Sequence, residues 1–123
     1  MRKSTLAYLN NQLADSGVNY EFGEWKSDIV YPYFVGEYNE APPNEEDGTA
    51  EATFMLNGFS TGQWLELEEA REKIEKLFTF NTAILDDGTA VCVSYAGSLI
   101  IPTGDATLKR IQINISIKEW RIM

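Results

Sequence analysis

Residues 107–120, TLKRIQINISIKEW, decide the fold class of this chain. Isoleucine returns at every second position, and polar side chains occupy the positions between; the isoleucines are Ile111, Ile113, Ile115 and Ile117. A period of two predicts a β-strand with one face on a core and the other in water. Because sheets with one wet face are usually antiparallel, we expect an antiparallel sheet.

Three other segments are candidate strands of this sheet. Residues 31–38, YPYFVGEY, are rich in side chains that suit a pleated surface, and Pro32 stands near the first position. Residues 49–56 alternate between apolar and polar side chains and predict a hairpin partner for residues 31–38. After the turn signal Asp86-Asp87-Gly88, residues 89–95 predict another strand. Residues 79–85 fit either a strand or the tail of a helix.

Apolar spacing predicts two helices. Residues 63–78 follow the capping signature Ser60-Thr61-Gly62-Gln63, which argues against a hairpin turn at Asn57-Gly58. Their apolar stripe consists of Trp64, Leu67, Ala70, Ile74, Leu77 and Phe78. A shorter helix, capped by Ser4 or Thr5, carries its apolar stripe on Leu6, Leu9 and Leu13 and stops before Gly17.

These elements predict an α+β fold: an antiparallel sheet of about four strands, packed by two helices on one face. The chain has 123 residues, a length that suits a single domain spanning residues 1–123. Residues 18–30 mix aromatic and polar side chains and predict irregular structure without an assigned role.

Two loops separate the predicted elements. Residues 39–48 contain two prolines and four acids, among them Glu45, Glu46 and Asp47, and predict an exposed segment that either connects a hairpin or is ordered by a partner. Residues 97–105 carry the exposed-looking apolar run Leu99, Ile100 and Ile101 before Pro102. An acidic loop and an apolar loop are both candidate contact surfaces.

The charge of the chain disfavours some partners. Nineteen acidic and ten basic residues give a formal net charge of −9. Such a charge repels nucleic acid phosphates and anionic membranes over a Debye length of about 8 Å in physiological salt. Neither a secretory signal pattern nor a run of about 20 apolar residues is present in the sequence, so we expect a soluble protein that is made inside a cell.

The residue types present also limit the chemistry. The chain has no histidine, which removes Ser-His and Cys-His catalysis and most zinc sites. Cys92 lies in an apolar run and is interpreted as a small buried hydrophobe in a reducing compartment. Glu66 and Glu69 are neighbours on the polar side of a predicted helix, where a solvated surface explains them better than an acid–base pair. We therefore expect a protein without catalytic, cofactor or metal sites.

The order of these segments resembles the tail completion, or tail terminator, proteins of long-tailed bacteriophages. The resemblance covers nearly the whole chain. It is carried by the strand Tyr31-Pro32-Tyr33-Phe34-Val35, the acidic loop, a strand leading straight into a Glu-rich helix, the segment Thr103-Gly104-Asp105-Ala106-Thr107-Leu108-Lys109-Arg110 and the last strand.

The resemblance implies a structural protein of virion assembly. Such proteins form a ring, typically of six copies, on the finished end of the tail tube, stop its growth and offer a surface for head joining. The implied partners are further copies of the chain, the tail tube protein and a head–tail connector protein. The implied locations are the cytoplasm of a bacterial host during assembly and the virion tail.

A ring contact joins two different patches of one subunit. We expect Leu99, Ile100 and Ile101 to form one patch, and the strand edge near Trp120 to form the other. Trp120 continues the polar-facing series of the last strand, so it is either covered by another subunit or caps the sheet edge. The acids Glu45, Glu46 and Asp47 are further candidates for contacts with a neighbour or the tube.

Two alternatives stay open. The chain could be a small acidic ligand-binding or regulatory α+β module, with a pocket lined by the aromatic residues Tyr20, Phe22, Trp25, Tyr31 and Tyr33. It could also be an enzyme that works with carboxylates alone, although no pair of acids has a spacing that demands this.

Overall fold

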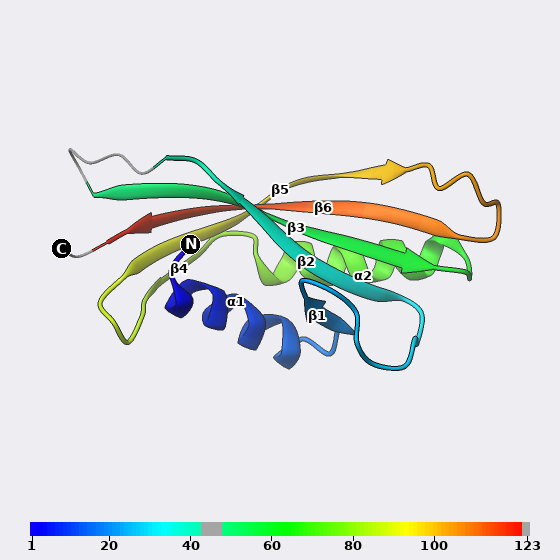
Figure 1. The fold of residues 1–123 in the computed structure, drawn as a ribbon, viewed down its shortest axis with the longest axis horizontal. Coiled ribbons are helices and arrows are strands. Elements are labelled where there is room, and N and C mark those ends of the chain that lie inside the picture. Colours follow the sequence, from blue (N-terminus) through cyan, green and yellow to red (C-terminus); the bar gives the residue numbers. More distant parts are fainter. Residues whose placement is uncertain (43–47, 122–123) are drawn as a thin grey trace.

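The structure is a computed structural model that describes residues 1–42 and 48–121. The described residues form two helices, each followed by three strands (Figure 1): α1 (Lys3–Asp15), β1 (Tyr20–Phe22), β2 (Tyr33–Glu40), β3 (Thr49–Ser60), α2 (Trp64–Leu77), β4 (Asn81–Ile84), β5 (Ala90–Ile101) and β6 (Lys109–Trp120). The strands form one sheet in the order β1-β2-β3-β6-β5-β4. This sheet curls into a half-barrel.

The expected antiparallel sheet of about four strands is therefore wrong. The sheet has six strands and is mixed, because β1 pairs in parallel with β2 while the other neighbours are antiparallel. β1 has three residues and β4 has four, so neither is long enough to show a reliable period of two. Both short strands lie at the edges of the sheet, outside the four longer strands whose sequence patterns are recognisable.

Two strands are longer than expected. β3 continues through Asn57-Gly58 to Ser60, because β6 pairs with its whole length and β2 pairs with Ala52–Phe59, so that both neighbours hold this dipeptide in the sheet. β5 continues past Tyr95 to Ile101 after a register shift between Tyr95 and Ser98. Gly97 lies inside this irregularity with φ of 107°, a conformation that favours glycine. The loop expected at residues 97–105 is thus a strand in its first half.

Both helices lie on the same side of the sheet (Figure 1). Leu9 and Leu13 of α1 and Leu67 and Ile74 of α2 are fully buried in one cluster with the alternating isoleucines of β6. Burial of such side chains stabilises the fold by about 1.5–3 kcal/mol each. The cluster also contains Phe34, Ala52, Phe54, Leu56, Phe78, Val91 and Val93.

The other side of the sheet, called the open face below, carries no helix (Figure 1). On each strand, the side chains that alternate with the buried ones lie on the open face. On β6 these are the even-numbered residues from Arg110 to Trp120. The middle of the open face is polar and mostly uncharged, with Thr53, Ser94, Gln112, Asn114 and Ser116.

Candidate functional site

The predicted contact residues Leu99, Ile100 and Ile101 lie in β5. Leu99 and Ile100 expose 47% and 59% of their surface, and Ile101 is half-buried. Since β4 pairs only with residues 90–93 of β5, no strand covers the outer edge of β5 at these three residues. Trp64, at the start of α2, lines the same shallow groove as Ile100 and Ile101. This end of β5 is an exposed apolar surface.

A second apolar surface surrounds Trp120, at the end of β6. Trp120 is 40% exposed, and the ammonium group of Lys118 lies 5.1 Å from the centroid of its ring. Phe80 and Ile84 lie beside it and are 68% and 82% exposed. We call Phe80, Ile84 and Trp120 the β4 patch. They line a shallow groove of about 410 Å³ together with Thr82, Ala83, Ala90, Val91 and Cys92.

Sequence reasoning missed the contribution of Phe80 and Ile84. The sequence of residues 79–85, TFNTAIL, fits either a strand or the tail of a helix, and this ambiguity does not identify a contact surface. The signal was present, because these seven residues contain no charge, no proline and no glycine in a chain that is 24% charged. An uncharged run of this kind next to a turn is typical of a strand.

The two apolar surfaces lie at opposite ends of one lateral side of the sheet. Ile101 pairs with Arg110 and Ala90 pairs with Trp120, so ten residues of β6 separate the two levels. At 3.3 Å per residue this corresponds to roughly 30 Å. Leu99 and Trp120, expected to belong to two complementary patches, are thus on the same side of the subunit.

The acidic candidates Glu45, Glu46 and Asp47 lie outside the described residues. The predicted acidic loop is described only at its ends, up to Pro42 and from Gly48. At the first of these ends, Glu40 accepts a hydrogen bond of 2.6 Å from Arg121, which joins the end of β2 to the end of β6.

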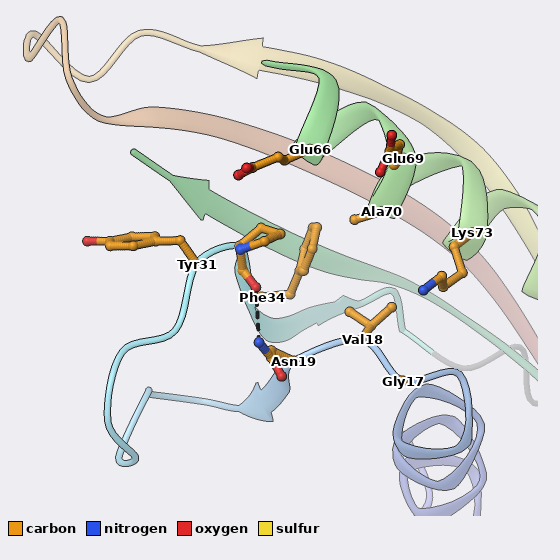
Figure 2. Close-up of a pocket in the computed structure, with 10 residues that line it drawn as sticks. Gly17, Val18, Asn19, Tyr31, Phe34, Glu66, Glu69, Ala70 and Lys73 are labelled. Carbon is orange, nitrogen blue, oxygen red and sulfur yellow. Dashed lines mark hydrogen bonds between the residues drawn. The ribbon is translucent and has the colours of Figure 1, made fainter. Parts of the chain in front are cut away.

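A hollow of about 410 Å³ lies between α2 and the segments that flank β1 (Figure 2). Glu66, Glu69 and Lys73 project from α2 on one wall, and Tyr31 lies on the opposite wall (Figure 2). Glu66 accepts a hydrogen bond of 3.2 Å from the Ser60 hydroxyl. The other lining residues are Gly17, Val18, Asn19, Pro32, Phe34 and Ala70. Two carboxylates and one ammonium group make this hollow a candidate site for a small polar molecule.

The aromatic residues proposed to line one pocket are divided between the two faces of the sheet. Tyr20 and Phe22 lie on the helix side, each with its ring centroid 6.3 Å from that of Phe54. Trp25 and Tyr31 instead pack on Tyr33, on the open face, with centroid distances of 4.8 and 5.6 Å. Only Tyr31 of the five contributes to the hollow beside α2.

A buried carboxylate ties the start of α1 to the end of β6. Glu119 is 1% exposed and accepts hydrogen bonds from the Thr5 hydroxyl, from the backbone N–H of Arg2 at 3.1 Å and from Arg121 at 2.8 Å. Burial acts to raise the pKa of Glu119, but these hydrogen bonds outweigh it and hold the pKa below its usual value. Arg121 also pairs with Glu40, which receives a second ion pair from the α-amino group of Met1.

This cluster has a structural role, and sequence reasoning did not identify it. Glu119 takes the core-facing position that follows Ile117 in the alternation, where a charged side chain requires a partner. Its carboxylate also serves the free N–H groups at the start of α1, where negative charge is favourable. The available signal in the sequence was Glu119 itself, a charged residue at a position where the alternation of β6 predicts an apolar one.

Groups suited to metal binding or nucleophilic chemistry are sparse in the described residues. Residues 1–42 and 48–121 contain no group of three Cys, Asp or Glu side chains that could hold a metal ion. Cys92 is half-buried on the open face of β5 and lines the groove of the β4 patch. Neither helix is long and apolar enough to cross a membrane.

Comparison with known proteins gave no assignment. A scan against protein-family models and a search of curated proteins both returned no match to this chain. The function of the chain is therefore inferred from the positions of its own residues.

Proposed function

We propose that this chain is a structural assembly protein of a long-tailed phage or prophage that caps the tail tube as a ring. In this role it stops tail elongation and provides the surface for head joining. Its partners are copies of itself, the tail tube protein and a head–tail connector protein. It acts in the cytoplasm of the bacterial host during assembly and in the virion tail afterwards.

The observation that carries this proposal is the row of exposed apolar side chains along one side of the sheet. Each of these side chains is at least 40% exposed: Leu99 and Ile100 lie on β5, Ile84 on β4, Phe80 directly before β4, and Trp120 at the adjoining end of β6. Soluble monomers rarely expose large apolar patches, whereas subunit interfaces require them. A ring subunit needs one such side for its neighbour.

The open face supports the same role. Its centre carries amide and hydroxyl side chains, and the whole chain has a formal net charge of −9. A wall of this kind does not bind phosphates strongly, because the counterion release that drives protein–DNA affinity requires clustered cations. If the open face lines the channel of the ring, DNA passes through without being held.

The proposal is tested by native mass spectrometry over a hundredfold concentration range, combined with negative-stain electron microscopy. We expect a closed ring with a central channel that becomes more abundant as the concentration rises. Open filaments, or a monomer at every concentration, would contradict the ring.

The hollow beside α2 favours a second candidate function, a ligand-binding or regulatory module. Tyr31, Glu66, Glu69 and Lys73 offer a polar ligand both charges and one aromatic ring. Intrinsic fluorescence, titrated with a panel of polar metabolites, tests this candidate. A saturable change that Glu69→Gln removes and that leaves the oligomeric state unaltered would favour it over the ring.

A further inference from the structure

The outer edge of β4 has no neighbouring strand among residues 1–42 and 48–121. β4 is the last strand of the sheet, and Leu85 N–H donates to Thr89 O across the turn to β5. Because backbone groups alternate in direction along a strand, the N–H and C=O groups of Thr82 and Ile84 point away from β5. Native edge strands are usually blocked by lysine, proline or an inward charge, and residues 79–85 contain none of these.

The opposite side of the sheet has a second free edge, on β2. β1 pairs with Phe34, Val35 and Gly36 only. Phe34 N–H donates to Asn19 O, and Gly36 O accepts from Gly23 N–H, each at 2.8 Å. The same alternation therefore directs the backbone groups of Tyr38 and Glu40 outward, beyond the end of β1.

The two free edges overlap at one level of the sheet, that of Asn81 and Glu40, and the rest of β4 continues past the end of β2. Asn81 on β4 and Glu40 on β2 are joined across it by paired residues: Val93, Ile117 and Ala52. β4 and β2 also run in the same direction, since an odd number of antiparallel strands separates them. Two copies placed side by side in one orientation bring β4 of the first beside β2 of the second.

We propose that neighbouring copies of this chain join through these edges, with the beginning of β4 in one subunit, up to Thr82, pairing in parallel with residues 37–40 at the end of β2 in the next. The contact uses two different surfaces of each subunit, so its repetition closes a ring when the rotation between subunits divides a full turn and gives an open filament otherwise. It rests on the proposed function and names the contact by which the ring closes.

The charges on the two edges favour a second copy of the chain in this orientation. The β2 edge carries the carboxylate of Glu37, whereas Glu40 is already paired with the α-amino group of Met1 and with Arg121, and β4 carries no charge. Pairing two β2 edges about a two-fold axis would bring like charges together, which is destabilising. Pairing β2 with β4 avoids this repulsion.

A backbone test uses Thr82→Pro, with Thr82→Val as the matched control. Proline removes the outward N–H of residue 82 and leaves the bonds between β4 and β5 intact. We expect Thr82→Pro to keep the wild-type circular dichroism spectrum and to lower the association constant at least tenfold. Thr82→Val, which keeps the N–H, should associate as the wild type does.

Disulfide trapping tests which edges meet. Asn39 and Phe80 stand on the open face at the same level, so Asn39→Cys and Phe80→Cys, each made with Cys92→Ser, place thiols on the two edges. Open-face side chains on neighbouring strands have Cβ atoms about 5 Å apart, within reach of a disulfide. We expect disulfide-linked dimers when the two variants are mixed, and none when either is oxidised alone.

The outcomes separate this contact from the proposed function. A ring that Thr82→Pro forms as well as the wild type does would overturn the edge contact and leave the ring function standing. Disulfide dimers from Phe80→Cys alone would show a two-fold β4 contact and would also overturn it. Open filaments that depend on the N–H of residue 82 would support the edge contact and contradict the ring.

Discussion

Glu119 shows how a single residue joins distant parts of this fold. Its carboxylate binds Thr5 and the backbone of Arg2 at the start of α1, and Arg121 at the end of β6. Arg121 reaches on to Glu40 at the end of β2. Glu119 therefore fixes the start of α1 against the sheet, although Arg2 and Thr5 are more than 110 residues away from it in the sequence.

Glu119→Gln is expected to lower the free energy of unfolding by roughly 2 kcal/mol at pH 7, because hydrogen bonds to a buried charge are lost or weakened. The folded state holds the pKa of Glu119 below its usual value of about 4.5. The stabilisation is thus complete above about pH 4.5 and is lost as the pH falls through the depressed folded pKa. Urea unfolding of both proteins at pH 7 and pH 3 measures this, and an equal difference at the two pH values would contradict it.

Gly58 is a glycine required by packing and not by a turn. It is buried near the end of β3, and a Cβ placed there would lie 2.3 Å from Cε1 of Phe34. The fully buried ring of Phe34 thus occupies the space above the glycine. This contact explains why Asn57-Gly58, a dipeptide typical of a hairpin turn, lies within a strand.

Gly58→Ala is expected to destabilise the fold by about 1–3 kcal/mol, because the Phe34 ring must leave its position. Thermal unfolding by circular dichroism measures the loss. Gly104→Ala is a loop control without neighbours within 4 Å, although its φ of 78° carries its own backbone strain. A second variant, Gly58→Ala with Phe34→Leu, should recover part of the stability if the clash is the cause.

At the scale of elements, β4 and the uncovered end of β5 together form one lateral side of the sheet. β4 covers the first part of β5, and the uncovered part carries Leu99 and Ile101 on the open face. The bulge between Tyr95 and Ser98 shifts the alternation, so that Leu99 and not Ser98 lies on this face. An irregularity of two residues thereby decides which side chains a neighbour meets.

Leu99→Asp combined with Ile101→Asp is expected to leave a folded monomer that no longer associates. Both residues lie at an uncovered edge, so we expect less than about 1 kcal/mol of change in folding stability. Analytical ultracentrifugation measures the association, and Leu99→Met with Ile101→Val serves as the apolar control. Unchanged assembly of the aspartate variant would remove this end of β5 from the interface.

At the scale of the whole molecule, the sheet separates three surfaces. Helices cover one face, the open face is polar at its centre, and the side formed by β5 and β4 is apolar (Figure 1). These surfaces are compatible with a ring whose subunits meet at their sides and whose open faces surround a channel. Charge substitutions can test whether the open face lines the channel.

The wild-type protein is expected not to bind duplex DNA at 50 mM salt in fluorescence anisotropy, because its net charge is −9. Glu51→Lys with Thr53→Lys adds cations to the open face and should produce salt-dependent DNA binding in the assembled ring. Glu69→Lys with Glu72→Lys is the control on α2, where the same kind of change should have a much weaker effect. Equal binding by both variants would contradict an open-face channel.

The sequence by itself determined the strongly patterned elements. The alternation of Ile111 to Ile117 and the apolar stripe from Trp64 to Phe78 depend on spacing within one segment, so β6 and α2 could be predicted. The exposed runs could also be recognised, since Leu99 and Ile100 stand out as apolar residues beside turn signals.

Tertiary structure alone decided the parts that depend on a neighbour. β1 and β4 are short and form because a longer strand offers them a partner, and the parallel pairing of β1 follows from the path of the chain after α1. Pairing likewise decided that Asn57-Gly58 is strand, that Leu99 and Trp120 share one side, and that Glu119 is buried with partners. Short-range periodicity does not contain this information, because each of these features is set by contacts between segments far apart in the sequence.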